Sequence, residues 1–185
     1  MSTASLRTKD GILEAARVEF AAHGLAGGRV DRIAKAAGAN VQRIYAYYGD
    51  KQGLFDAVVA SAVHGLAGQM DPHARGIDDV AGALFDCVVS HPENSRTMTW
   101  ARLEREEEFV RITGSDQGGT SPISLVARLQ RAGLVDPKPD ARVIVEALIA
   151  ICERCESFPS ADAASTVEER RDLVLRFART LAIDG

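Results

Sequence analysis

The chain has 185 residues, of which 46% are hydrophobic and 26% are charged, so it can bury the core of one large domain or of two smaller ones. Its formal net charge of −4 argues against a protein that coats nucleic acids generally. The charge is uneven, because residues 1–51 hold eight Lys or Arg against five Asp or Glu, whereas the remainder holds 14 against 21. A basic N-terminal segment joined to an acidic body fits a DNA-contacting part on a larger part that does not contact DNA.

Two further features point to an intracellular, cytoplasmic protein. The first ten residues, MSTASLRTKD, contain no apolar run of the kind found in secretory signals. The longest apolar stretch, ARVIVEALIAIC, is interrupted by Glu146 and is too short to cross a bilayer. The three cysteines are an odd number and suggest no disulfide framework.

The first two predicted helices lie in KDGILEAARVEFAAHG and LAGGRVDRIAKAAG. In the first, Ile12, Ala16 and Phe20 fall on one face, and Gly24 can end the helix in a left-handed conformation. In the second, apolar residues again form a stripe, which Gly38 ends.

A third, short helix is predicted from Val41 to Tyr48, with Asn40 as its N-cap. Ile44 and Tyr48 are four residues apart and point inward together. Two helices joined by a short Gly-containing turn form a helix-turn-helix, whose second helix enters the DNA major groove. The outward face carries Gln42, Arg43, Ala46 and Tyr47, with Tyr45 at its flank.

The chemistry of this face suits DNA. Arg43 can recognise guanine and Gln42 can recognise adenine through paired hydrogen bonds. Gly49 ends the helix and Asp50 can cap the next one, which places Lys51 in a first turn where free N–H groups and the helix dipole favour a backbone phosphate.

The stretch from Ile12 to Val58 resembles the TetR (tetracycline-repressor-like) family of bacterial transcription regulators. The resemblance rests on the order and spacing of elements that are weak singly. They are Ile33-Ala34, Ala37-Gly38, Tyr45, Tyr47-Tyr48, Lys51 and Leu54.

This resemblance implies roles for individual residues. Tyr45, Tyr47 and Lys51 are expected to contact phosphates, with Tyr47 also near bases, while Val41 is expected to meet a thymine methyl group. Tyr48 stands where the family has a core Phe, so it is interpreted as structural.

The sequence departs from the family pattern at two positions. Where the family often has Thr or Ser at the start of the second helix, this chain has Gly28, which can cap only through its backbone, so Arg29 is expected to supply a phosphate contact. Where the family often has Gly, this chain has Gln42, whose longer side chain should make the base preference more individual or shift the helix slightly outward.

The rest of the chain is predicted to be helical over 78–90, 92–112, 122–131, 140–157 and 166–183. The fourth of these is apolar nearly all round and must be covered on both sides. In the family, the last two long helices pair with their copies in a four-helix dimer interface. The expected interface residues are therefore Val145, Ile149, Leu173, Phe177 and Leu181, with a fully buried core helix as the alternative.

Two further candidate sites, one for a ligand and one for thiol chemistry, lie in the C-terminal part of the chain. Trp100, the only tryptophan, is expected to line an effector cavity with Phe85, Met98 and Leu103, against the alternative that all four simply pack the core. Cys152 and Cys155 form a Cys-x-x-Cys pair that lacks two further zinc ligands at suitable spacing, so packing is favoured over a metal or redox site. The acidic run LEREEEFVR is interpreted as a solvated helix face.

The sequence therefore predicts an all-α protein with a three-helix helix-turn-helix domain over 1–52 and a helical effector-binding and dimerisation domain over 53–185. The function expected is a homodimeric repressor that binds a palindromic double-stranded DNA operator and responds to a small, apolar effector through the family's mechanism. No cofactor, metal or enzymatic role is expected, because no nucleophile elbow, phosphate-binding loop or dinucleotide motif is present. Two alternatives stay open: a thiol-responsive regulator using Cys152 and Cys155, and an architectural DNA-binding protein without an effector.

Overall fold

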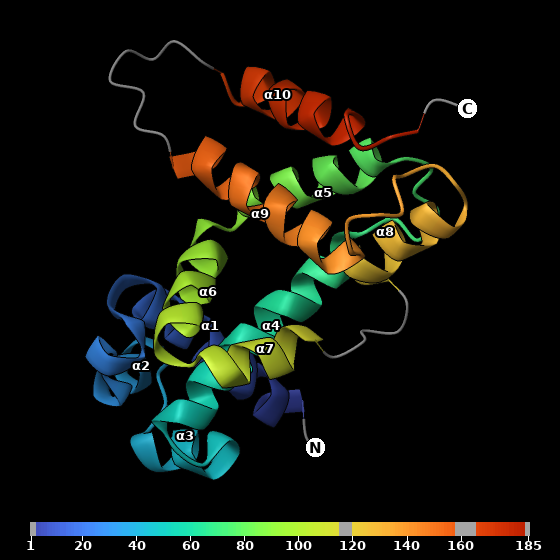
Figure 1. Ribbon diagram of the computed structural model, residues 1–185. Coiled ribbons are helices and arrows are strands. Elements are labelled where there is room, and N and C mark those ends of the chain that lie inside the picture. Colours follow the sequence, from blue (N-terminus) through green and yellow to red (C-terminus); the bar gives the residue numbers. More distant parts are fainter. Residues whose placement is uncertain (1–2, 115–119, 158–165, 184–185) are drawn as a thin grey trace. The chain divides into compact units, whose positions relative to one another are not determined.

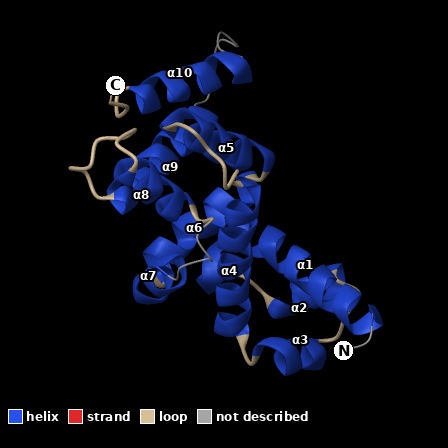
Figure 2. Ribbon diagram, turned by 90° about the vertical axis from the view of Figure 1, so that its right-hand side faces the viewer, coloured by secondary structure: helices blue, strands red, loops and turns tan. Residues whose placement is uncertain are grey.

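The structure is a computed structural model that describes residues 3–114, 120–157 and 166–183. Within these ranges the named elements are all α-helices (Figures 1 and 2). The single β-bridge found there joins Val135 to Ala182. The helices are α1 Thr3–Gly27, α2 Val30–Ala36, α3 Val41–Tyr48, α4 Lys51–Gln69, α5 Ile77–Ser90, α6 Pro92–Glu104, α7 Glu106–Gly114, α8 Pro122–Arg131, α9 Ala141–Ser157 and α10 Val167–Arg179. The all-α fold predicted from the sequence is confirmed.

The chain folds as two compact units that do not follow a single cut in the sequence. The first unit contains Met1–Val63 and Pro92–Ser115, and the second contains His64–His91 and Asp116–Gly185. The expected boundary after residue 52 therefore differs from the division made by the contacts. The difference arises because α6 packs against α1, and α7 contributes Phe109 and Ile112 to the core of the first unit.

The first unit encloses a core formed by the apolar faces predicted for its helices. Ile12, Phe20, Ile33 and Ile44 are all buried, and the Phe20 ring meets Phe55 edge to face with the ring centres 5.1 Å apart. Edge-to-face pairs add to the stabilisation that aromatic burial provides. This core fixes the orientations of α2 and α3, since each contributes one short apolar stripe to it.

The helix predicted over 92–112 is two helices, α6 and α7, divided at Arg105. The local sequence indicates one helix, because the segment contains no Gly or internal Pro to break it. At the break, the Arg105 guanidinium donates two hydrogen bonds to the Asp56 carboxylate of α4, at 2.7 and 3.3 Å. We attribute the break to such tertiary contacts, which sequence periodicity cannot reveal.

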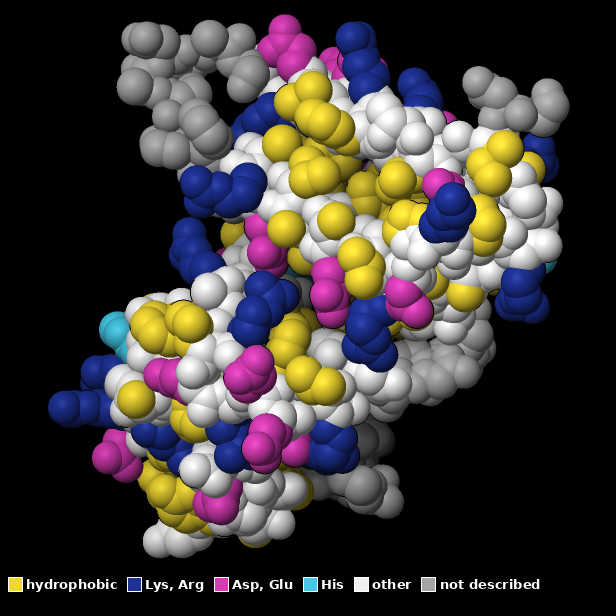
Figure 3. Space-filling model, viewed as in Figure 1, with side chains coloured by type: hydrophobic (Ala, Val, Ile, Leu, Met, Phe, Trp, Pro, Cys, Tyr) yellow, Lys and Arg dark blue, Asp and Glu magenta, His cyan; other side chains and the backbone are white. Residues whose placement is uncertain are grey.

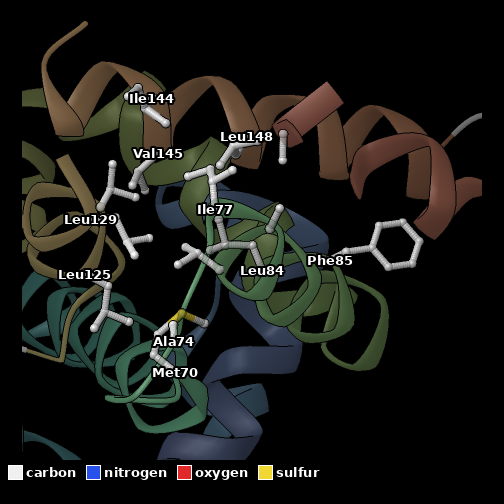
Figure 4. Close-up of a cluster of buried hydrophobic side chains, with 14 of the residues drawn as sticks. Met70, Ala74, Ile77, Leu84, Phe85, Leu125, Leu129, Ile144, Val145 and Leu148 are labelled. Carbon is white, nitrogen blue, oxygen red and sulfur yellow. The ribbon is translucent and has the colours of Figure 1, made fainter. Parts of the chain in front are cut away.

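The second unit packs α5, α8, α9 and α10 around a separate apolar cluster. Its centre includes Leu84, Leu125 and Leu148, which converge in the close-up of Figure 4. At the surface, Arg171 of α10 pairs with Asp86 of α5, with an N–O distance of 2.8 Å. In the described residues, no helix is long and apolar enough to span a membrane.

Candidate nucleic-acid interface

A short turn after α2 sets where α3 begins. Gly38 has a φ of 59°, a left-handed conformation that glycine adopts with little strain. The side-chain oxygen of Asn40 then accepts a hydrogen bond from the Arg43 backbone N–H at 2.7 Å, as a helix N-cap does. The predicted cap is confirmed, and the side chain of Ile44 is fully buried beneath α3.

The opposite face of α3 is open to solvent. Gln42, Arg43, Tyr45 and Ala46 are exposed, and Tyr45 retains 42% of its surface. Val41 and Tyr47 are only half-exposed, because both also pack against the core of the first unit. The side chains chosen as base-contacting candidates, Gln42 and Arg43, thus lie together on the accessible face of a short, capped helix.

Tyr48 has the structural position expected of it. Its side chain packs against the core of the first unit, and its hydroxyl donates a hydrogen bond to the Lys9 carbonyl at 3.2 Å. The Lys9 ammonium lies 5.6 Å from the ring centre, a favourable cation–π arrangement. Burial, with the nearby Asp10 carboxylate and Tyr47, raises the pKa of the Tyr48 hydroxyl, which therefore stays protonated and able to donate.

Lys51 begins α4, where the Asp50 carboxylate accepts a hydrogen bond from the Gly53 N–H at 2.7 Å. The Lys51 ammonium donates a hydrogen bond to the backbone carbonyl of Ala26, 3.2 Å away, in the last turn of α1. This contact was not predicted, and it holds the cation against the first helix. An ammonium has three donors, so this bond leaves capacity for a phosphate oxygen.

The start of α2 has no side-chain cap of its own and is held by a carboxylate of α1. Arg29 occupies the N-cap position and makes no side-chain cap bond, so its exposed guanidinium remains on the surface. The Glu19 carboxylate of α1 instead accepts a hydrogen bond from the Arg29 N–H at 2.8 Å and forms a two-pronged pair with Arg32. Partial burial alone would raise the pKa of Glu19, but the hydrogen bonds from Arg32 and Arg29 lower it, so the carboxylate is charged in its capping role.

The four residues expected to line an effector cavity belong to two different units. Phe85 is buried in the cluster of the second unit, whereas Met98 and Trp100 pack against the cluster of the first. Leu103 is 72% exposed. The role of these residues as one lining set stays a prediction, and the face of α6 that bears Trp100 packs against α1.

The residues expected at a dimer interface divide between surface and core. Leu173 and Phe177 of α10 are exposed by 47% and 51%, whereas Val145 of α9 is only 4% exposed. Ile149 and Leu181 are partly buried against the cluster of the second unit. Val145 thus lies on the core side of α9 within one chain, a side that the sequence did not reveal because a helix that is apolar all round does not show which face points inward. Its place in a dimer interface stays a prediction.

The cysteines lie in the second unit and show no sign of a metal site. Cys152 is fully buried and Cys155 is partly exposed. Burial, with smaller contributions from neighbouring Cys155 and Glu153, raises the pKa of the Cys152 thiol to about 12. Within the described ranges, no cluster of three His, Cys, Asp or Glu side chains could hold a metal ion.

A short helix with an exposed amide, guanidinium and phenol after a tight turn is the arrangement of a helix-turn-helix DNA-binding protein. Two family models match the chain: "Bacterial regulatory proteins, tetR family" over residues 12–58, and "Tetracyclin repressor-like, C-terminal domain" over residues 76–180. The chain belongs to the TetR family of bacterial regulatory proteins.

Several characterised relatives and solved structures are similar to this chain. The HTH-type transcriptional repressor SCO4008 of Streptomyces coelicolor is 44% identical over 123 residues, covering 60% of this chain and 64% of that protein. The HTH-type transcriptional repressor NicS of Pseudomonas putida is 32% identical over 95 residues, covering 47% of this chain and 44% of NicS. The matches thus span less than two thirds of these curated relatives. The crystal structure of SCO4942, also from S. coelicolor, superposes with a TM-score of 0.74 at 32% identity, covering 95% of this chain and 98% of that one.

Proposed function

We propose that this chain is a transcriptional repressor that binds a palindromic DNA operator as a homodimer and is released by a small apolar effector. The observation that carries the proposal is the exposed face of α3, where Gln42 and Arg43 stand side by side on a helix whose other face is anchored by Ile44. Arginine pairs well with guanine, and glutamine with adenine, in the major groove. Tyr45, Tyr47, Lys51 and Arg29 would bind phosphates, and Val41 would meet a thymine methyl group.

The partner is proposed to be a second copy of the chain, bound through α9 and α10. Val143, Ala147 and Ala150 lie along one exposed stripe of α9, and Leu173 and Phe177 along one of α10. Apolar side chains gather where these two helices reach the surface (Figure 3). A two-fold dimer would place its two α3 helices in half-sites about one helical turn, ~34–36 Å, apart.

The effector is proposed to enter the second unit. In the described residues of this unit the buried side chains are all apolar or cysteine, so a cavity opened among them would favour an apolar molecule. Phe85 lies in this unit and is the candidate contact there, while the roles of Met98, Trp100 and Leu103 stay predictions. Effector and operator would weaken each other's binding by the same factor, typically ~5–150-fold.

The chain is further proposed to act in the cytoplasm and to catalyse no reaction, in keeping with a family of transcription regulators. The thiol-responsive alternative loses support, because the raised pKa of buried Cys152 keeps it a thiol rather than the reactive thiolate.

Selection of duplex DNA from a random-sequence pool by the purified chain tests the proposal. We expect a palindromic consensus, and a dimer of the chain on the selected duplex by sedimentation. Arg43→Ala should lose about 5- to 150-fold of discrimination at one base pair of each half-site, the ~1–3 kcal/mol that a paired contact provides. Arg131→Ala removes the same charge from an exposed position of α8 and should keep the consensus. Recovery of no consensus by the wild-type chain would refute sequence-specific binding.

A further inference from the structure

The last turn of α1 has an unusual backbone. Gly24 has a φ of 65° and a ψ of −174°, which interrupts the helix before residues 25–27 resume it. We call residues 24–27 the Gly24 turn. The interruption separates the N–H groups of Leu25 and Ala26 from the regular helical pattern, and it presents them as donors at the start of a new turn.

One side chain of α6 meets these donors. The Glu104 carboxylate accepts a hydrogen bond from the Leu25 N–H at 2.6 Å, and the Ala26 N–H lies 3.3 and 3.4 Å from its two oxygens. A carboxylate is well suited to this place, because adjacent N–H groups at the start of a helical turn favour an anion. Glu104 thus acts as a cap supplied by another helix, at a separation of 79 residues in sequence.

The same face of α6 covers the glycine itself. Trp100 lies one helical turn before Glu104, and a Cβ atom at Gly24 would come within 2.8 Å of its indole ring. The turn is therefore enclosed by a ring and a carboxylate that are four residues apart on α6. This fit requires glycine both for its positive φ and for the space.

The Gly24 turn also holds a residue of the proposed DNA interface. The Ala26 carbonyl accepts the hydrogen bond from the Lys51 ammonium, while the Ala26 N–H faces Glu104. Arg105, next to Glu104, pairs with Asp56 of α4, five residues after Lys51. Glu104 and Arg105, at the end of α6, therefore contact α1 and α4, the two helices that position the Lys51 ammonium.

From these contacts we infer that Glu104 is a positioning residue for DNA binding: it fixes the Gly24 turn, whose Ala26 carbonyl holds Lys51 for a backbone phosphate. The inference rests on the proposed function, since it assigns a DNA-directed role to a residue that does not itself face DNA. Loss of the Glu104 carboxylate should free the turn and let the Lys51 ammonium sample other positions.

The first test measures the hydrogen bond without DNA. Amide hydrogen exchange of the full chain should show Leu25 and Ala26 exchanging at least ~10-fold faster in Glu104→Ala than in wild type, because the amides lose their acceptor. Glu107→Gln, which removes one negative charge from an exposed position of α7, is the control and should leave both amides unchanged. Unchanged exchange in Glu104→Ala would overturn the capping role.

The second test measures DNA binding on the duplex that the wild-type chain selects. Relative to Glu107→Gln, Glu104→Ala should bind about 3- to 10-fold more weakly, with a salt slope smaller in magnitude by up to about 1.8, as for the loss of one phosphate contact in each subunit of the dimer. In a Lys51→Ala background, Glu104→Ala should cost little more, because the two changes act on one contact. Glu104→Gln, which keeps an oxygen acceptor, should restore part of the affinity and serves as the second variant if Glu104→Ala melts early.

The outcomes separate this inference from the function on which it rests. Additive losses from Glu104→Ala and Lys51→Ala, or an unchanged salt slope in a folded Glu104→Ala chain, would overturn the positioning role while the wild-type consensus left the proposed function intact. A wild-type chain that selects no sequence would refute the function, and the inference would fall with it.

Discussion

The face of α3 and the paired surfaces of α9 and α10 both expose side chains that suit a partner, but they are built differently. The α3 face is polar and stands on a helix of eight residues that is fixed by its own cap, its own turn and one buried isoleucine. The α9 stripe is apolar and lies on a helix whose inward side is also apolar. Local signals decide which side of α3 is exposed, whereas only the packing of the second unit decides it for α9.

The largest effect should come from disrupting the apolar surface of α9 and α10. Phe177→Asp places a charge on the exposed stripe of α10, where a partner helix would have to bury it twice in a symmetric dimer. We expect a monomer at micromolar concentration, and operator binding weakened by roughly 100-fold or more as two linked half-sites become independent. Sedimentation and anisotropy titrations measure the two quantities.

Arg43→Ala is the control for Phe177→Asp, because it changes the other surface. Arg43→Ala should alter base preference and leave the dimer intact, while Phe177→Asp should remove the dimer and leave the preferred half-site sequence intact. A Phe177→Asp chain that remained dimeric would show that α10 does not form the interface.

The same contrast explains what the sequence could and could not predict. The Asn40 cap, the Asp50 cap and the burial of Ile44 follow from residue types and spacings within a few positions, and the structure confirms them. The face of Val145 and the place of Trp100 depend on which helices pack together over long separations. No local pattern distinguishes the core side of an all-apolar helix, or a tryptophan that covers a glycine of α1.

The division at Arg105 and the contacts of Glu104 and Lys51 were missed for the same reason. In the sequence, Glu104 belongs to an acidic run typical of a solvated face. Only the fold brings its carboxylate to the N–H groups of Leu25 and Ala26, which the Gly24 turn separates from the regular helical pattern. Glu19 is a similar case, because only the fold brings its carboxylate to the Arg29 N–H at the start of α2.

A pair of glycine substitutions tests how much the Gly24 turn depends on this long-range fit. Gly24→Ala forces a side chain into a positive φ and toward the Trp100 ring, and should reduce the free energy of unfolding by about 1–3 kcal/mol. Gly65→Ala lies within the C-terminal part of α4 with open space around it, and should raise the same quantity by about 0.5–1 kcal/mol. The urea concentration at the midpoint of unfolding should therefore shift in opposite directions in the two variants. An unchanged free energy of unfolding in Gly24→Ala would mean that the turn accommodates a side chain without strain.

The smallest effect concerns the interior of the second unit and its dependence on pH. Because the pKa of Cys152 is raised to about 12 from an ordinary value of 9.0, the folded chain keeps this proton at pH values where the unfolded chain has lost it. The stability due to the neutral thiol is therefore fully present below about pH 9 and is lost as the pH rises toward 12. Cys152→Ala should be less stable than wild type at pH 7.5, and the gap should narrow by up to ~1.4 kcal/mol per pH unit above pH 9. Urea unfolding of both chains at pH 7.5, 9 and 10 measures the gap, and the difference cancels the titration of other groups. If the stability difference between the two chains did not change with pH, the Cys152 thiol would be more accessible to water than its burial in the structure implies.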